Sequence, residues 1–167
     1  MSLAALVETC TVVTATRSRT AKVAALAGLL ALTSPDDIPV VVGLLLGKPR
    51  QGRIGVGWRS LADLDAEPAD APSLTVGDVD AVFTELAESR GAGSQNERRA
   101  LLTGLFLRAT PPERDHLHAV LTGQVRTGAL EGVLTDAVAV ASGLPVARVR
   151  RAAMLTGDLA VAAQAAA

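Results

Sequence analysis

Aromatic residues are almost missing from this sequence, which has 167 residues, 2% aromatics and no tyrosine. Ala, Leu, Val and Arg dominate instead, and β-branched residues seldom alternate with polar ones as they do in half-buried strands. Apolar residues recur at helical spacing, for example at Leu3, Leu6, Val7, Cys10 and Val13. With 49% hydrophobic residues, the chain can bury a core of its own. The sequence therefore predicts an all-α fold, a compact multi-helix domain.

The sequence also lacks the features of disulfide-bonded and membrane-spanning proteins. Cys10 is the only cysteine, so no disulfide framework can form, and a lone thiol among apolar neighbours is typical of a reducing, cytoplasmic setting. The longest apolar runs, at 24–32 and 40–46, fall short of the roughly 18 residues that a membrane span needs. A basic-then-apolar signal peptide is absent. We therefore expect a cytoplasmic protein with no membrane partner.

The net charge of −1 hides an uneven distribution of charge along the chain. Residues 60–89 contain eight acids and no Lys or Arg, whereas the rest of the chain carries all 16 basic residues and only nine acids. Outside the acidic stretch, the chain thus has an excess of seven positive charges. Because charge acts by surface region and not by sum, the sequence predicts a basic face that attracts a polyanion.

The stretch "LLLGKPRQGRIGVGW", residues 44–58, interrupts the helical pattern with four glycines, a proline and three basic residues. A nucleotide-binding P-loop is excluded, because only three residues separate Gly43 from Gly47, Pro49 follows Lys48, and a helix precedes the glycines where a strand is required. Glycines let backbone N–H groups approach a phosphate closely, and an arginine supplies a charged fork. The loop is therefore either a basic surface for a nucleic-acid backbone or a helix C-cap followed by solvated side chains.

An internal repeat makes this loop one of a pair. A shift of 76 residues aligns 18–52 with 94–128 without a gap, with ten identities in 35 positions. We therefore expect two pseudo-repeated helical units, about 1–64 and 75–142, joined by an acidic linker at 65–74 and followed by C-terminal helices at 145–167. Each copy ends in Gly-x-x-Arg-x-Gly, formed by Gly47, Arg50 and Gly52 in the first and by Gly123, Arg126 and Gly128 in the second.

Residues that are suited to cap helices recur at equivalent positions of the two copies. Ser18 is predicted to cap the helix that starts at the next residue, and Ser34 is predicted to cap the one after it. In the second copy, Thr110 stands where Ser34 stands in the first. Ser94 and Glu97 have the spacing of a capping box.

Other conspicuous residues are predicted to be structural. Phe83, Phe106 and Met154 fall on apolar helical stripes and are expected in the core. Trp58 is expected to anchor the glycine-rich loop to the core, with stacking on a base as the alternative. The two histidines lack a third ligand nearby, so no metal site is expected, and no cofactor is expected in this chain.

Specific motifs follow the second loop. Gly132 precedes an Ala-x-Ala-x-Ala-Ser-Gly run at 137–143, which Val-Arg-Arg-Ala at 149–152 and Thr-Gly-Asp-Leu at 156–159 follow. Together with the Gly-x-x-Arg-x-Gly turn, this order resembles the N-terminal DNA-binding domain of ATP-dependent DNA ligases. The Leu-x-Gly at 45–47 and the Gly-x-Gly at 55–57 also match that family. The resemblance covers nearly the whole chain, except that the acidic segment 63–80 carries no motif.

The resemblance implies a helical domain that docks on the minor groove on either side of a nick, through backbone contacts that are independent of sequence. It implies nicked double-stranded DNA as a partner, together with the adenylation and OB-fold domains of the parent ligase. ATP and a divalent cation such as Mg²⁺ are implied for that parent, which would act on DNA at the nucleoid in repair, replication and recombination. The ligase nucleophile is a lysine in Lys-x-Asp-Gly, a sequence that follows neither Lys22 nor Lys48, so we do not expect this chain to seal a nick by itself.

The DNA-binding residues follow from the resemblance and the repeat. Arg126, Thr127 and Gly128 match the phosphate-contacting turn of the family most closely, and Arg50 and Gly52 follow by the repeat. Their neighbours and the cations near helix N-terminal ends complete the expected site: Gly123, Lys48, Arg53, Gly55, Gly57, Arg17, Arg19, Lys22, Arg98 and Arg99.

Two alternatives stay open. Arg148, Arg150 and Arg151 serve either DNA or the adenylation domain. The chain as a whole could instead be a helical protein-docking module whose basic loops bind an acidic partner, and salt-dependent DNA binding would separate the two functions.

Overall fold

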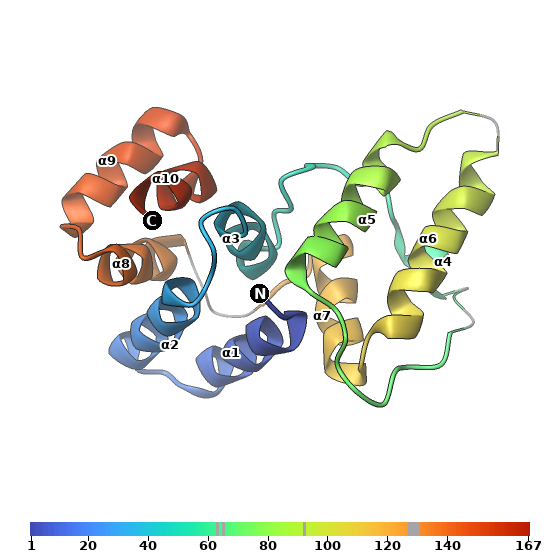
Figure 1. The fold of residues 1–167 in the computed structure, drawn as a ribbon, viewed down its shortest axis with the longest axis horizontal. Helices are drawn as coiled ribbons and strands as arrows, with labels where there is room; N and C mark the ends of the chain where they lie inside the picture. The colour runs from blue at the N-terminus through green and yellow to red at the C-terminus, as the bar shows by residue number, and fades with distance from the viewer. Residues whose placement is uncertain (63, 65, 92, 127–130) are drawn as a thin grey trace.

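The computed structural model describes residues 1–62, 64, 66–91, 93–126 and 131–167 (Figure 1). In these residues, the regular secondary structure consists of ten α-helices, with one isolated antiparallel bridge between Ser2 and Thr75. The predicted all-α fold is therefore confirmed. The first five helices are α1 (Leu3–Ala15), α2 (Arg19–Ala31), α3 (Ile38–Leu46), α4 (Trp58–Ala62) and α5 (Val76–Glu88). The other five are α6 (Ser94–Arg108), α7 (Pro111–Leu121), α8 (Glu131–Ser142), α9 (Val146–Thr156) and α10 (Leu159–Ala166).

None of the described helices is by itself long and apolar enough to cross a membrane. Helices α8 and α9 together have the length and composition of a span, but the chain bends by 120° between them.

Two of the predicted helix caps form and two do not. Ser18 accepts a hydrogen bond from the Ala21 N–H (3.2 Å), and Thr110 forms a reciprocal capping box with Glu113. The predictions for Ser34 and Ser94 are wrong, because each helix begins elsewhere. The residues after Ser34 make a turn first, in which the Asp37 N–H donates to the Ser34 carbonyl (3.0 Å), so that Asp37 is the N-cap of α3.

The second wrong cap has a different cause. Gly93, at a φ of 88°, takes the N-cap position of α6, and Ser94 is already helical. Glu97 therefore does not bond back to its own helix start, but accepts a hydrogen bond from the Ser89 hydroxyl (2.6 Å). The left-handed glycine supplies a helix start that a serine pattern does not reveal.

The helices form two groups around a central layer (Figure 1). Helices α8, α9 and α10 pack together at one end, and α5 packs against α6 at the other. Between them lie α1, α2 and α3, of which α2 packs on α8 and α3 packs on α10.

Packing between the two predicted units is reciprocal. Under the shift of 76 residues, α1, α2 and α3 correspond to α5, α6 and α7. Helix α3 packs against α5, and the corresponding pair, α7 and α1, also packs together. This exchange is what a pseudo-twofold relation between two copies would produce, although the duplication itself and the unit boundaries stay predictions.

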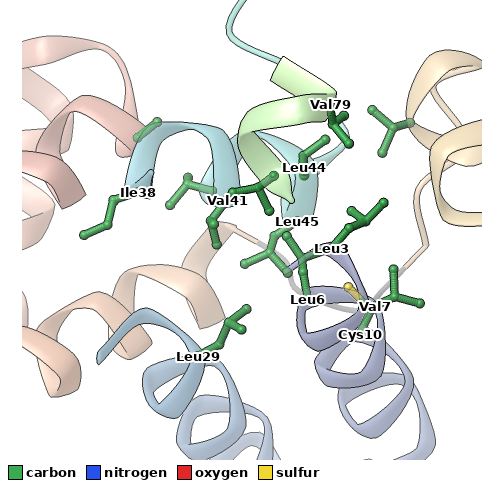
Figure 2. Close-up of a cluster of buried hydrophobic side chains, with 14 of the residues drawn as sticks. Leu3, Leu6, Val7, Cys10, Leu29, Ile38, Val41, Leu44, Leu45 and Val79 are labelled. Atoms are coloured by element: carbon green, nitrogen blue, oxygen red, sulfur yellow. The ribbon is translucent and has the colours of Figure 1, made fainter. Parts of the chain in front are cut away.

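The core near this central layer is aliphatic (Figure 2). Leu3, Leu6 and Cys10 of α1 face Leu44 and Leu45 of α3, and all five side chains are buried. Burial raises the pKa of the Cys10 thiol to about 12, so this cysteine behaves as a small apolar side chain.

Two of the three predicted core residues are in the core. Phe83 and Phe106 are buried, as expected from their helical stripes. The prediction for Met154 is wrong, because its side chain is 84% exposed and the next residue, Leu155, is 79% exposed. Both lie in the last turn of α9, which packs on α8 and α10 through other residues such as the buried Val149.

Candidate nucleic-acid interface

Two glycine-rich turns end equivalent helices. The first loop (residues 47–57) follows α3, and the second loop (residues 123–126 of the part that the structure describes) follows α7. Gly47 and Gly123 have φ values of 66° and 69°, in the left-handed region that L side chains rarely adopt. The backbone N–H after each glycine donates to a carbonyl of the helix, Lys48 to Gly43 (2.8 Å) and Gln124 to Ala119 (2.7 Å). The helix C-cap part of the sequence interpretation is therefore correct in both copies.

The two loops touch each other. A Cβ built on Gly47 would lie 2.7 Å from Cγ2 of Val125, well inside van der Waals contact. Val125 is thus pressed against the bare backbone at Gly47, where no other residue type leaves enough space. Lys48, Arg50 and Arg126 therefore branch from two loops that touch through the Val125 side chain.

Helix α5 anchors the first loop. The Arg50 guanidinium binds the Asp80 carboxylate with two hydrogen bonds, one from Nε (2.6 Å) and one from Nη2. The Gln51 amide donates to the same carboxylate (2.7 Å) and to the Thr84 hydroxyl (2.9 Å). Arg50 nevertheless remains about half exposed, with 53% of its side chain open to solvent. Asp80 thereby fixes the first loop. It also occupies some of the N–H groups through which Arg50 could bind another anion.

This ion pair shifts both pKa values. The hydrogen bond to Asp80 raises the pKa of Arg50, which keeps its full charge. Burial would raise the pKa of Asp80, but the hydrogen bonds from Arg50 and Gln51 outweigh it and hold that pKa below its usual value.

Basic side chains also surround the first turn of α8. Lys48 of the first loop lies 3.6 Å from the Glu131 carboxylate, at the start of this helix. Arg19, the first residue of α2, donates to the carbonyl of Gly132 (3.1 Å) and to the carboxylate of Asp136 (2.7 Å). The N-terminal end of α8 carries the positive end of its dipole, so these cations and the helix contribute potential of the same sign.

The predicted residue Arg98 has a structural contact. Its guanidinium donates to the carbonyl of Ile54 (2.6 Å) and to that of Leu86, and so ties the end of the first loop to α5 and α6. The backbone at Gly55, at a φ of 73°, passes close to the same guanidinium, since a Cβ there would lie 3.4 Å from Nη2. Arg98 thus has a structural role, in which it supports the first loop.

The remaining predicted residues lie on the surface. Arg17, Arg53, Gly57, Arg99 and Arg126 are exposed, and Lys22 is half-buried. Gly52, at a φ of 69°, closes the turn that begins at Pro49, with its N–H bonded to the Pro49 carbonyl (2.9 Å). Thr127 and Gly128 lie outside the residues that the structure describes.

Trp58 packs on helix α7 and is not buried in the core, and its alternative role, stacking on a base, stays a prediction. The indole is 54% exposed, and its edge packs on the ring of His118 in α7, with ring centroids 4.5 Å apart. One side of the indole therefore anchors the loop, and much of the ring faces solvent.

Sequence reasoning missed Asp80 and Asp136 as site residues. Each carboxylate binds arginines that lie far from it in the chain, and only the fold brings them together. Neither acid belongs to a recognisable motif, so no local pattern could have found them.

The sequence of this chain is similar to known proteins, and the similarity includes the regions just described. A family model, DNA ligase N terminus, matches residues 65–139. A probable DNA ligase of Pseudarthrobacter chlorophenolicus is 56% identical over 159 residues, which cover 95% of this chain and 31% of that protein. Probable DNA ligases of Rhodococcus jostii and Streptomyces griseus are 53% and 52% identical, over 91% and 95% of this chain.

The chain is homologous to the N-terminal part of DNA ligases. The resemblance found in the sequence motifs is therefore confirmed. This ligase-type domain spans about a third of the length of the curated relatives that it matches, 31% of the P. chlorophenolicus protein. The family match at 65–139 includes the acidic segment with Asp80, helices α5 to α7 and the second loop.

Proposed function

We infer that this ligase-type domain binds double-stranded DNA independently of sequence and holds a nicked duplex for an ATP-dependent DNA ligase. The observation that carries this proposal is the contact between the two loops, in which Val125 packs on Gly47. Because both backbones are exposed turns with basic residues, one extended polyanion can meet both loops at once.

The chemistry of the loops suits a phosphate backbone better than bases. The side chains available are Lys48, Arg50, Arg53 and Arg126, which are all exposed. Cationic side chains and backbone amides contact phosphate oxygens and position a protein on the duplex without reading its sequence. Minor-groove contacts around a nick would follow from the same surface.

The parent protein would supply the remaining chemistry. In the proposed ligase, adenylation and OB-fold domains form the rest of the chain, and they use ATP and a divalent cation such as Mg²⁺. This domain would contribute DNA affinity and orientation, in a cytoplasmic, nucleoid-associated enzyme of DNA repair or replication.

Fluorescence anisotropy with labelled duplexes tests the proposal. The 167-residue chain is titrated against a nicked and an intact duplex of the same sequence, and against a second sequence, at low salt. We expect binding that differs little between the two sequences. Arg126→Ala should weaken it on every duplex. Arg108→Ala is the control, because Arg108 is another exposed arginine, but it lies at the C-terminal end of α6 and pairs with Asp78 of α5.

The competing function gives a different result. If the loops bind an acidic protein, the chain should show no measurable affinity for either duplex at low salt. That outcome would reject DNA binding and favour the protein-docking module.

A further inference from the structure

Asp136 of α8 holds arginines from two other helices. Its carboxylate accepts hydrogen bonds from Nε (3.3 Å) and Nη2 (2.7 Å) of Arg19 in α2. On its other oxygen it accepts a hydrogen bond from Nη2 of Arg150 in α9 (3.3 Å). Both arginine side chains are 58% exposed, whereas that of Asp136 is 25% exposed. The carboxylate therefore lies beneath two guanidinium groups that face solvent.

The cluster has a net positive charge and unused donors. One carboxylate offsets only one of the two guanidinium charges. A guanidinium has five N–H groups in a fixed plane, and the bonds from Arg19 to Asp136 and Gly132 leave its Nη1 group available. Exposed ion pairs of this kind add little stability.

The cluster continues the surface of the two loops. Gly132 and Asp136 are one helical turn apart on α8, and Glu131, next to Gly132, pairs with Lys48 of the first loop. From Glu131 to Asp136 the helix rises by about 7.5 Å, which exceeds the axial rise of about 3.4 Å per phosphate along one strand of a duplex. A duplex that contacts Lys48 would thus present further phosphates along α8, toward Arg19 and Arg150.

We propose that Arg19 and Arg150 form a binding site for a DNA backbone phosphate, in which Asp136 orients both guanidinium groups. This site rests on the proposed function, because it extends the same DNA surface beyond the loops. In the structure, Arg150, on which sequence reasoning left two roles open, shares the Asp136 carboxylate with Arg19. Asp136 is a positioning residue in this site, since its carboxylate would repel the phosphate if it stood alone.

The test measures the salt dependence of binding to a nicked duplex for Arg150→Ala and Arg150→Lys. Loss of one phosphate contact should make the slope of log K against log salt shallower by about 1 for Arg150→Ala. Arg150→Lys should keep the slope of the unchanged chain, because it keeps the charge, and Arg108→Ala should keep it as well. Arg19→Ala should repeat the effect of Arg150→Ala.

A merely structural ion pair predicts another pattern. Arg150→Ala would then lower the melting temperature and leave the slope unchanged at temperatures where the variant is folded. If the unchanged chain binds DNA and Arg126→Ala makes the slope shallower while Arg150→Ala does not, the phosphate site is wrong and the proposed function stands. If the unchanged chain does not bind DNA at all, the proposed function itself fails.

Discussion

Gly47 and Val125 are in direct contact, with Cγ2 of Val125 placed 2.7 Å from where a Cβ of residue 47 would lie. The contact joins the ends of two corresponding helices, α3 and α7, and so fixes the relative position of the two basic loops. Residue 47 meets two separate demands that favour glycine: its backbone has a left-handed φ of 66°, and it has no side chain.

The first prediction separates these two demands. Gly47→Ala should lower the free energy of unfolding by about 2–4 kcal/mol, because it adds a steric clash to the cost of roughly 1–2 kcal/mol for a non-glycine residue in the left-handed region. Gly123→Ala, at a φ of 69° but with nothing within 4 Å of its Cβ, should carry only the backbone cost. Urea unfolding measures both variants.

Gly28→Ala is the control for these substitutions. Gly28 is an exposed position inside α2 with open space around its Cβ, so alanine should be neutral or should stabilise the fold by up to about 1 kcal/mol. Equal losses for Gly47→Ala and Gly123→Ala would mean that the contact with Val125 contributes nothing.

The second prediction concerns Asp80, whose pKa is held below its usual value by Arg50 and Gln51. A carboxyl with a depressed folded pKa contributes stability above its unfolded pKa of about 3.9, and this contribution is lost as the pH falls through the lower folded value. Asp80→Asn should therefore cost roughly 1 kcal/mol at pH 7. The difference from the unchanged chain should shrink at pH 3.

Unfolding at the two pH values checks this, with Glu8→Gln as the control, an exposed acid on α1. A cost for Asp80→Asn that is the same at pH 7 and pH 3 would show that the charge of Asp80 does not anchor the first loop.

The third prediction concerns His116 in α7, which lies against the end of α3. Burial lowers the pKa of His116 to about 4, and a hydrogen bond from the ring to the Leu44 carbonyl offsets the effect only in part. In the folded chain the ring thus stays neutral between pH 6.5 and pH 4, while the unfolded chain takes up a proton there. Stability should therefore fall as the pH drops through this range, by about 3 kcal/mol from this residue.

His116→Gln removes the titrating group and keeps a donor for Leu44. This variant should lose stability less steeply than the unchanged chain between pH 6.5 and pH 4. If the free energy of unfolding falls equally with pH for His116→Gln and for the unchanged chain, the result would contradict a neutral, buried His116 ring.

The sequence was informative for several features that depend on neighbours in the chain. Helix α2, its cap at Ser18, the cap at Thr110 and the glycine stops at Gly47 and Gly123 form as predicted, whereas the caps predicted at Ser34 and Ser94 do not. The motifs that resemble ligase N-terminal sequences are equally local, and the comparisons confirm that resemblance.

The sequence failed where tertiary structure decides. Met154 has the spacing of a core residue, but its side chain is exposed and is not covered by any helix that the structure describes. Asp80 and Asp136 are bound to arginines 30 and 117 residues away, Arg50 and Arg19, and such pairs have no signature in the chain.

The most direct test of the account compares the salt dependence of nicked-duplex binding for the unchanged chain, Lys48→Ala, Arg126→Ala and the double variant. If both loops contact one duplex with roughly six phosphate contacts, the slope of log K against log salt should be near −5. It should become shallower by about 1 in each single variant and by about 2 in the double variant. A slope that changes for only one of the two loops, or for neither, would contradict the claim that the touching loops form one DNA-binding surface.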